Sequence, residues 1–386
     1  MYTLLLALIY IAFISLGLPD SLLGSGWPAM HGDLQVPVSY MGIVSMIISA
    51  GTVVSSLCSY RLTKKLGTPA VTVASVFLTA VALLGFSFSS QFWMLLALAV
   101  PYGLGAGAID AALNNYVALH YTSRHMSWLH CFWGVGTIVS PFVMSYSLTN
   151  ATWHMGYRTI GFVQLGIAVL LLLTLPVWKV NPPKADTSSQ AKGLAGALKI
   201  KGVPALLLGF LAYCAAEATS MSWASTYLVE TKGMAAERAA QFASLFFIGI
   251  TAGRFLGGFL MNKLGDWKMI LLGTGVLACG LAALMLPLPG EFFSLAGLVI
   301  IGLGCAPIYP CIIHATPANF GPENSAAIIG IQMASAYVGS TFAPPLFGLL
   351  GNHIAFGLFP FYVAVFALLM ITMTGRAFRV ANPESR

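Results

Sequence analysis

Long apolar stretches alternate with short polar connections along almost the whole chain. A helix that crosses the hydrocarbon core of a bilayer needs about 20 apolar residues. Measured against that length, the pattern predicts twelve membrane-spanning helices, at residues 2–30, 40–62, 69–88, 92–121, 128–149, 157–179, 202–228, 239–261, 269–288, 292–315, 325–350 and 357–376. We therefore expect an all-α membrane protein.

The first predicted span carries residues that interrupt helices, namely Gly17, Pro19, Gly24, Gly26 and Pro28. Proline and glycine in a spanning helix are typical of a kink, so we expect one here. The apolar stretch starts without a basic leader, which indicates a retained helix rather than a cleaved signal peptide.

One connection is long and polar. It runs from Asn181 to Lys199 and includes the letters PPKADTSSQAKG. It separates six predicted spans from another six. We expect a six-helix bundle at residues 1–180, a cytoplasmic linker at 181–199 and a second six-helix bundle at 200–386.

The composition makes lipid the solvent for most of the chain. Of its 386 residues, 58% are apolar and 8% are charged, whereas a soluble domain carries roughly 25% charged residues. The six cysteines all fall inside apolar spans without metal-ligand spacing, so we interpret them as packing residues. We expect neither a cofactor nor a metal.

The net charge of +7 comes from basic residues that are scattered over short loops. Because they do not gather on one face, nucleic acid is not an expected partner. With the N-terminus inside, 15 of the 18 Lys and Arg residues fall on the cytoplasmic side, which is the usual bias of membrane proteins. We expect a multi-pass protein of the plasma membrane, in a bacterium the inner membrane, with both termini in the cytoplasm.

The two halves of the chain repeat one another. Three patterns recur at a nearly constant offset: Arg61-Leu-Thr-Lys-Lys-Leu-Gly67 with Met261-Asn-Lys-Leu-Gly265, Gly103-Leu-Gly105 with Gly302-Leu-Gly304, and Asp20 with Glu217. Repeated halves around a site at the bilayer midplane are typical of secondary transporters. The repeat predicts two pseudo-symmetric halves with a substrate between them.

Three carboxylates, Asp20, Asp110 and Glu217, lie inside apolar spans. A charge near the bilayer centre is costly, so such a residue usually faces a protein interior or a water-filled cavity and marks function. Poor hydration penalises the charged form of a carboxylate, which suits it to loading and releasing a proton. We predict proton coupling by these three acids; the alternative is that each bonds a neighbouring helix and is structural.

The spans and the duplicated loop pattern resemble the major facilitator superfamily over nearly the whole chain. The segment Gly103-Leu-Gly-Ala-Gly-Ala-Ile-Asp110-Ala-Ala-Leu-Asn114-Asn-Tyr-Val117 resembles the fourth helix of fucose-permease-like transporters. The Asp20-Ser-Leu-Leu turn and Gly302-Leu-Gly-Cys-Ala-Pro-Ile-Tyr-Pro310 match that branch as well.

This resemblance implies proton-coupled sugar symport by alternating access, with Asp20 and Asp110 at positions that handle protons and bind substrate. Asp110 departs from the family pattern, because better-known members carry Glu there. The proton site of this chain can therefore lie elsewhere along the cavity wall.

Several polar and aromatic residues are candidates for solute binding. Asn114 lies four residues after Asp110 and shares its helical face, and Gln332 is a second amide within a span. Aromatic rings suit the apolar face of a sugar ring, which makes candidates of Trp27, Trp133, Trp223, Tyr309 and Tyr337. His130 is a candidate proton relay to Asp110. For each residue the alternative is ordinary packing or a bridge between helices.

The distribution of cations bears on the solute. Arg254 is placed at the cytoplasmic end of its span, and no Lys or Arg is expected at mid-membrane. Anionic substrates normally need a cationic clamp, so a neutral or cationic small molecule fits better.

A proton-driven exporter of lipophilic or cationic compounds is the alternative function, since buried acids serve it equally well. Such exporters usually carry a Gly-Pro and a glycine pair in the fifth span, whereas here Gly136 to Ser145 keeps Pro141 without those glycines. No nucleophile and base occur at helical spacing, so we expect no enzyme activity. The expected partners are a small-molecule substrate, protons and the lipid bilayer, and we expect a monomer.

Overall fold

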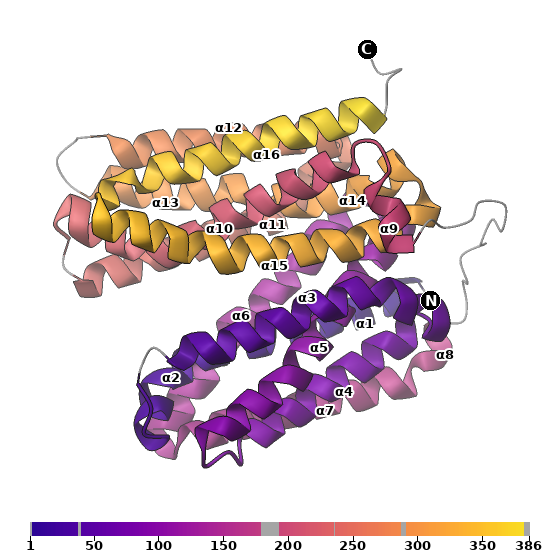
Figure 1. Cartoon of the computed structure of the whole chain (residues 1–386), viewed down its shortest axis with the longest axis vertical. Coiled ribbons are helices and arrows are strands. Elements are labelled where there is room, and N and C mark those ends of the chain that lie inside the picture. The colour runs from indigo at the N-terminus through magenta and orange to yellow at the C-terminus, as the bar shows by residue number, and fades with distance from the viewer. Residues whose placement is uncertain (1, 38–39, 179–192, 235, 287–290, 382–386) are drawn as a thin grey trace. The chain divides into compact units, whose positions relative to one another are not determined.

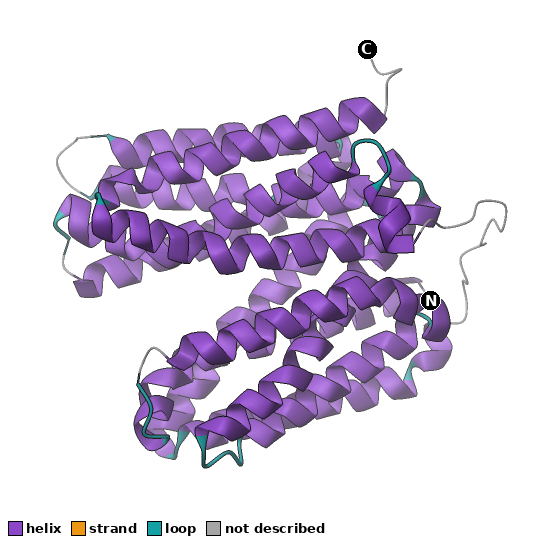
Figure 2. Ribbon diagram, viewed as in Figure 1, coloured by secondary structure: helices purple, strands orange, loops and turns teal. Residues whose placement is uncertain are grey.

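The computed structural model describes residues 2–37, 40–178, 193–234, 236–286 and 291–381. Within these residues the chain is helical with short loops and has no strand (Figure 2). Twelve helical stretches are long and apolar enough to cross a membrane: Thr3–Asp33, Met41–Leu66, Thr68–Phe86, Phe92–His120, Ser123–Asn150, Trp153–Leu173, Val203–Lys232, Leu245–Leu264, Asp266–Met285, Phe292–Phe320, Pro322–His353 and Phe356–Ala381. They confirm the predicted number of spans and the all-α membrane class.

The chain divides into two compact units. Unit 1 comprises Met1–Tyr116 and Phe132–Gly193, and unit 2 comprises Val117–Cys131 and Leu194–Arg386. The end of one helix and the start of the next, residues 117–131, thus belong to unit 2 although they come from the first half of the sequence.

Unit 1 is built from the first eight helices, of which α5 and α6 run on into unit 2: α1 (Tyr2–Asp20), α2 (Leu22–Asp33), α3 (Met41–Leu66), α4 (Thr68–Phe86), α5 (Phe92–His120), α6 (Ser123–Asn150), α7 (Trp153–Leu173) and α8 (Leu175–Trp178). Helices α4 and α7 lie side by side (Figure 1). A core of large apolar side chains, including Leu22, Phe86 and Tyr157, fills the space between α2, α4 and α7.

Unit 2 contains the remaining helices: α9 (Gly193–Leu198), α10 (Val203–Lys232), α11 (Ala236–Leu264), α12 (Asp266–Met285), α13 (Phe292–Cys305), α14 (Ile308–Phe320), α15 (Pro322–His353), the short 3-10 helix η2 (Phe356–Leu358) and α16 (Phe359–Ala381). Helix α10 packs along both α15 and α16, and α13 packs along both α11 and α12. These two groups of three helices position the polar residues of unit 2, among them Glu217 on α10 and Arg254 on α11.

Large apolar side chains also point outward. Phe142 and Leu173 in unit 1 are both 73% exposed, and Phe292 in unit 2 is 72% exposed. In water such an apolar surface would promote aggregation, whereas lipid tails solvate it. The chain is a multi-pass membrane protein.

The predicted linker is partly helical. Residues 181–192 lie outside the described residues, but Gly193–Leu198 forms α9. Ala197 is fully buried there, which indicates that apolar packing, and not sequence polarity, fixes this segment. The sequence analysis did not predict this helix because it is short and directly follows a polar stretch.

Two spans are interrupted near their middle. The first breaks at Ser21, between α1 and α2, which confirms the predicted kink. The tenth breaks at Ala306 and Pro307, between α13 and α14. Both breaks lie at or beside a proline, Pro19 in the first span and Pro307 in the tenth. Proline has no backbone N–H to donate to the preceding helical turn, which favours a break there.

Close glycine contacts repeat in the two units. In unit 1 a Cβ added to Gly51 of α3 would lie 3.2 Å from Cα of Gly103 of α5. In unit 2 a Cβ added to Gly249 of α11 would lie 3.2 Å from Cα of Gly302 of α13. The equivalent glycines are separated by 198 and 199 residues. The internal repeat is therefore present in the packing as well as in the sequence.

Candidate functional site

Asp20 lies at the break in the first span. It is the last residue of α1, and the hydroxyl of Ser21 in the break donates to the backbone oxygen of Thr137 at 2.8 Å. Glycines at positions 17 and 136 let α1 approach α6 closely. Backbone irregularity within a membrane is tolerated where other groups supply its hydrogen bonds. The break thus presents Asp20 to α6.

Two donors hold the carboxylate of Asp20. The indole Nε1 of Trp133 donates to its Oδ2 at 2.8 Å, and the hydroxyl of Tyr102 makes a second hydrogen bond to it. Asp20 is nevertheless exposed, although it lies in the middle of its span. An accessible carboxylate that is held in place by an indole is equipped to exchange a proton.

Asp110 is held differently. Nδ2 of Asn114 donates to Oδ1 of Asp110 at 2.8 Å and to its backbone oxygen at 3.0 Å, which confirms that the two share one face of α5. Asp110 is only 5% exposed and Asn114 is fully buried. Asp110 is close enough to Asp20 for an electrostatic interaction. Of these two mid-span acids, Asp20 is therefore accessible and Asp110 is enclosed.

Unit 2 contains a buried ion pair. Nη2 of Arg254 on α11 lies 3.0 Å from Oε1 of Glu217 on α10, and their side chains are 4% and 15% exposed. Glu217 is near the middle of α10. The sequence-based expectation of no cation at mid-membrane was therefore wrong: Arg254 lies near the middle of its span, Leu245–Leu264, and not at the cytoplasmic end where the sequence analysis placed it.

Aromatic rings surround this ion pair. Tyr213 lies one turn before Glu217, hydrogen-bonds its carboxylate, and donates to the backbone oxygen of Cys305 at 2.9 Å. That oxygen belongs to the last residue of α13, where helix carbonyls lack their usual partners. The ring of Tyr309, just beyond the break, lies 6.0 Å from the ring of Tyr213. The broken tenth span and α10 are thus joined beside the acid.

His130 also belongs to this group in unit 2. Its ring contacts the ring of Tyr309 at 4.7 Å between centroids, it is 5% exposed, and it interacts electrostatically with Arg254. Its suggested relay partner Asp110 belongs to unit 1. The contacts described for His130 are with Tyr309 and Arg254, and the relay to Asp110 stays a prediction.

Two candidate tryptophans make packing contacts. Trp27 is 2% exposed in the core of unit 1, with its ring edge against Phe92. Trp223 donates to the backbone oxygen of Pro344 at 2.8 Å and packs on Phe347. Solute binding by either indole stays a prediction.

The remaining two candidates are on α15. Gln332 is fully buried and its Oε1 accepts a hydrogen bond from Thr316 at 3.0 Å. Its Nε2 has no hydrogen-bond partner. Tyr337 is half-buried. Neither residue is in a described contact with Glu217.

Three important residues were missed by sequence reasoning. Tyr213 lies four residues before Glu217, a spacing that places both on one helical face and could have identified it. Tyr102 precedes the glycine pattern of the fourth span and has no such signal relative to Asp20. Arg254 was noticed, but as a cation at the cytoplasmic end of its span. Among the described residues no group of three or more His, Cys, Asp and Glu side chains could hold a metal ion.

The chain was compared with known families and proteins. It matches the sequence model of the Major Facilitator Superfamily over residues 9–344. Bypass of stop codon protein 6 of Saccharomyces cerevisiae is 25% identical over 285 residues, which are 66% of this chain and only 56% of the yeast protein. The 4-hydroxybenzoate transporter PcaK of Pseudomonas aeruginosa is 25% identical over 379 residues, covering 87% of this chain and 84% of that protein.

Among solved structures the chain is similar to the transporter FucP in an outward conformation. The TM-score is 0.81 at 17% identity, with 96% of this chain and 98% of the other covered. A second structure of that protein, the fucose:proton symporter of E. coli, gives a TM-score of 0.77 at 18% identity and covers 100% of this chain and 99% of the other. At this identity the likeness concerns the fold alone.

Proposed function

Because the chain belongs to the Major Facilitator Superfamily, we propose that this transporter is a proton-coupled symporter of a neutral sugar or a similar small polar solute. The family and the fold point to a transporter rather than an enzyme. One observation carries the proposal: Asp20 is a mid-span carboxylate that is both exposed and held by Trp133.

Asp20 is the proposed proton carrier. An ionised carboxylate only accepts hydrogen bonds, whereas a protonated one also donates. Proton binding therefore changes the bonds that Asp20 makes with Trp133 and Tyr102, on α6 and α5. A proton that alters contacts between helices can favour one conformation over another, which coupling requires.

Asp110 and Asn114 complete the proposed site in unit 1. The amide of Asn114 already occupies one oxygen of Asp110, so these two residues act as a fixed polar wall. The ring of Trp133 offers an apolar face for a sugar. Trp27 and Trp223 are secondary candidates, since both make packing contacts within their units.

Glu217, Arg254, His130 and Tyr309 are the proposed contribution of unit 2, with Tyr337 and Gln332 as further candidates. Arg254 is compensated by Glu217, so the pair offers no net positive charge to an anion. This supports a neutral solute. The 4-hydroxybenzoate transporter among the relatives is named for an anion, which makes an aromatic carboxylate the necessary comparison.

The proposed mechanism is alternating access, which the internal repeat of the chain supports. We propose a monomer in the plasma membrane, with both termini in the cytoplasm, because 14 of the 17 Lys and Arg residues other than Arg254 then lie inside. A bacterial inner membrane fits this arrangement.

Uptake into proteoliposomes tests the function. An inward proton gradient is expected to drive accumulation of one or more radiolabelled hexoses, pentoses or polyols, and Asp20→Asn is expected to abolish that accumulation. Glu230→Gln removes an exposed carboxylate from α10 and is expected to transport normally. Gradient-driven uptake of 4-hydroxybenzoate alone, or export of a lipophilic cation without sugar uptake, contradicts the proposal.

A further inference from the structure

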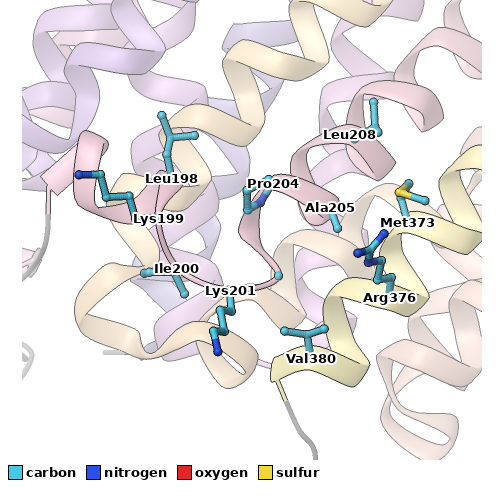
Figure 3. Close-up of a pocket in the computed structure, with 11 residues that line it drawn as sticks. Leu198, Lys199, Ile200, Lys201, Pro204, Ala205, Leu208, Met373, Arg376 and Val380 are labelled. Atoms are coloured by element: carbon cyan, nitrogen blue, oxygen red, sulfur yellow. The ribbon is translucent and has the colours of Figure 1, made fainter.

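A pocket of about 520 Å³ opens where the turn before α10 meets the end of α16 (Figure 3). It lies wholly within unit 2, and neither Glu217 nor another acid is among the residues that line it. Its walls combine cationic and apolar side chains: Leu198, Lys199, Ile200, Lys201, Gly202, Pro204, Ala205, Leu208, Met373, Arg376 and Val380. The proposed transport function uses none of them.

The polar part of the pocket is entirely cationic. Lys199 and Lys201 come from the turn and Arg376 from α16, on the other side of the pocket (Figure 3). All three residues are exposed, and no carboxylate is among the lining residues. The first turn of α10 also lines the pocket, and the start of a helix carries partial positive charge. The pocket is therefore suited to an anion.

The apolar part of the pocket continues away from these charges. Leu208 and Met373 lie one turn or so further into α10 and α16 than Pro204 and Arg376. Leu208 is 41% exposed, which leaves an apolar strip open beside the cations. A small inorganic anion makes no favourable contact with this apolar strip, whereas an amphiphile can bury an acyl chain against it.

The pocket lies at the ends of two membrane spans. Helix α10 begins at Val203 and α16 ends at Ala381, so the cations lie where lipid headgroups are found and the strip runs toward the hydrocarbon. We propose that this pocket binds an anionic glycerophospholipid, with the phosphate at Lys199, Lys201 and Arg376 and an acyl chain along Leu208 and Met373. Basic pockets between helix ends are suited to such headgroups.

The turn that carries the two lysines is held in place. The amide of Ile200 donates to the backbone oxygen of Ala197 at 3.1 Å, and that of Val203 donates to Ile200 at 3.1 Å. Gly202 has a φ of +94°, and a Cβ there would lie 3.0 Å from the backbone oxygen of Ala377 on α16. Only glycine suits this conformation and this close approach. The backbone that carries the two lysines is thus fixed against the end of α16 and is not a loose segment.

Lipid titration with matched variants tests the proposal. The protein is purified in a neutral detergent, phosphatidylglycerol or phosphatidylcholine is added, and bound lipid is counted by native mass spectrometry. The triple variant K199Q/K201Q/R376Q is compared with K263Q/K268Q/R379Q, which removes three exposed cations that do not line the pocket. Folding of each variant is checked by size exclusion and thermal unfolding.

We expect the native protein to retain phosphatidylglycerol in preference to phosphatidylcholine. Each charge near a lipid surface changes affinity roughly fivefold, so the pocket triple variant should lose affinity on the order of 100-fold while the control keeps it. If the triple variant does not fold, Arg376→Gln is compared with Arg379→Gln, with an expected loss of roughly fivefold.

Two results overturn the proposal. One is equal retention of phosphatidylglycerol by the pocket variant and its control. The other is complete displacement of the lipid by millimolar inorganic phosphate or glycerol 3-phosphate, because that identifies a site for a soluble phosphate and leaves the apolar strip without a role. Neither result depends on an uptake measurement, so the lipid site is tested independently of the transport function.

Discussion

The guanidinium of Arg254 lies 3.0 Å from the carboxylate of Glu217, in the interior of unit 2. The hydroxyl of Tyr213 also lies close to the carboxylate of Glu217, and the hydroxyl of Ser127 donates to the backbone oxygen of Arg254 at 2.5 Å. Each ion has lost most of its water, so each depends on the other for compensation. The pair links α10 to α11 and provides the first prediction.

Removing one member of this pair should harm the protein more than removing both. Glu217→Gln or Arg254→Gln leaves a buried ion unpaired, which costs about 3 to 5 kcal/mol, whereas the double variant leaves two neutral groups. We expect the apparent melting temperature in detergent to fall in each single variant and to recover in part in the double variant. A double variant at least as unstable as the sum of the two single variants contradicts this.

The indole of Trp133 should matter for transport through its N–H group. Trp133→Phe keeps an aromatic ring but removes the donor to Asp20, and a hydrogen bond to a charged group contributes about 1.5 to 3 kcal/mol. If that bond is used in the transport cycle, the initial rate of proton-driven uptake should fall by roughly tenfold or more.

Trp153→Phe is the matched control. The Nε1 of Trp153 donates to Oδ2 of Asp33 at 2.8 Å, the same bond at the same length as that from Trp133 to Asp20. It lies outside the proposed site, so we expect lower stability with near-normal uptake per folded molecule. Equal loss of uptake in Trp133→Phe and Trp153→Phe would indicate that Trp133 has only a structural role.

The repeated glycine contacts should be intolerant of a methyl group. A Cβ at Gly103 of α5 or Gly302 of α13 meets the backbone of the facing helix, so Gly103→Ala and Gly302→Ala should each cost about 1 to 3 kcal/mol or more from overpacking. Gly275 of α12 has nothing within 4 Å of an added Cβ. Gly275→Ala should be neutral or stabilising by up to about 1 kcal/mol. Thermal unfolding of the three variants separates these outcomes.

Gln332 offers a test of whether a buried amide serves the solute. Its Nε2 has no partner, and Thr316, which donates to its Oε1, also lies 3.0 Å from the backbone oxygen of Ile312. Gln332→Met has similar volume and removes an unsatisfied donor, so we expect the melting temperature to be unchanged or higher. Lost uptake at full stability would then assign Gln332 to solute binding, and normal uptake would remove it from the site.

Much of the fold could be predicted because the determining forces act locally along the chain. The length of an apolar stretch sets whether it can cross a bilayer, and the spans appear at the predicted places. Proline and glycine around Asp20 predicted the break in the first span, since backbone restrictions act within a few residues. The spacing of Asp110 and Asn114 predicted their contact for the same reason.

The environment of the acids could not be predicted in this way. Trp133 is 113 residues from Asp20, and Arg254 is 37 residues from Glu217. Their meeting depends on how each helix is rotated and how closely it packs. In a soluble protein the polar face of a helix would reveal that rotation, but in lipid both the outer and the inner face of a helix are apolar.

The sequence by itself therefore determined that the chain spans a membrane in twelve helices, that its halves repeat, and that acids lie within the spans. Only the tertiary structure decided which of them meets a cation, which is exposed beside an indole, and that Trp27 is enclosed in the core. The physical reason is that hydrophobic length and helical spacing are properties of one segment, whereas helix rotation and side-chain reach are fixed by packing between segments.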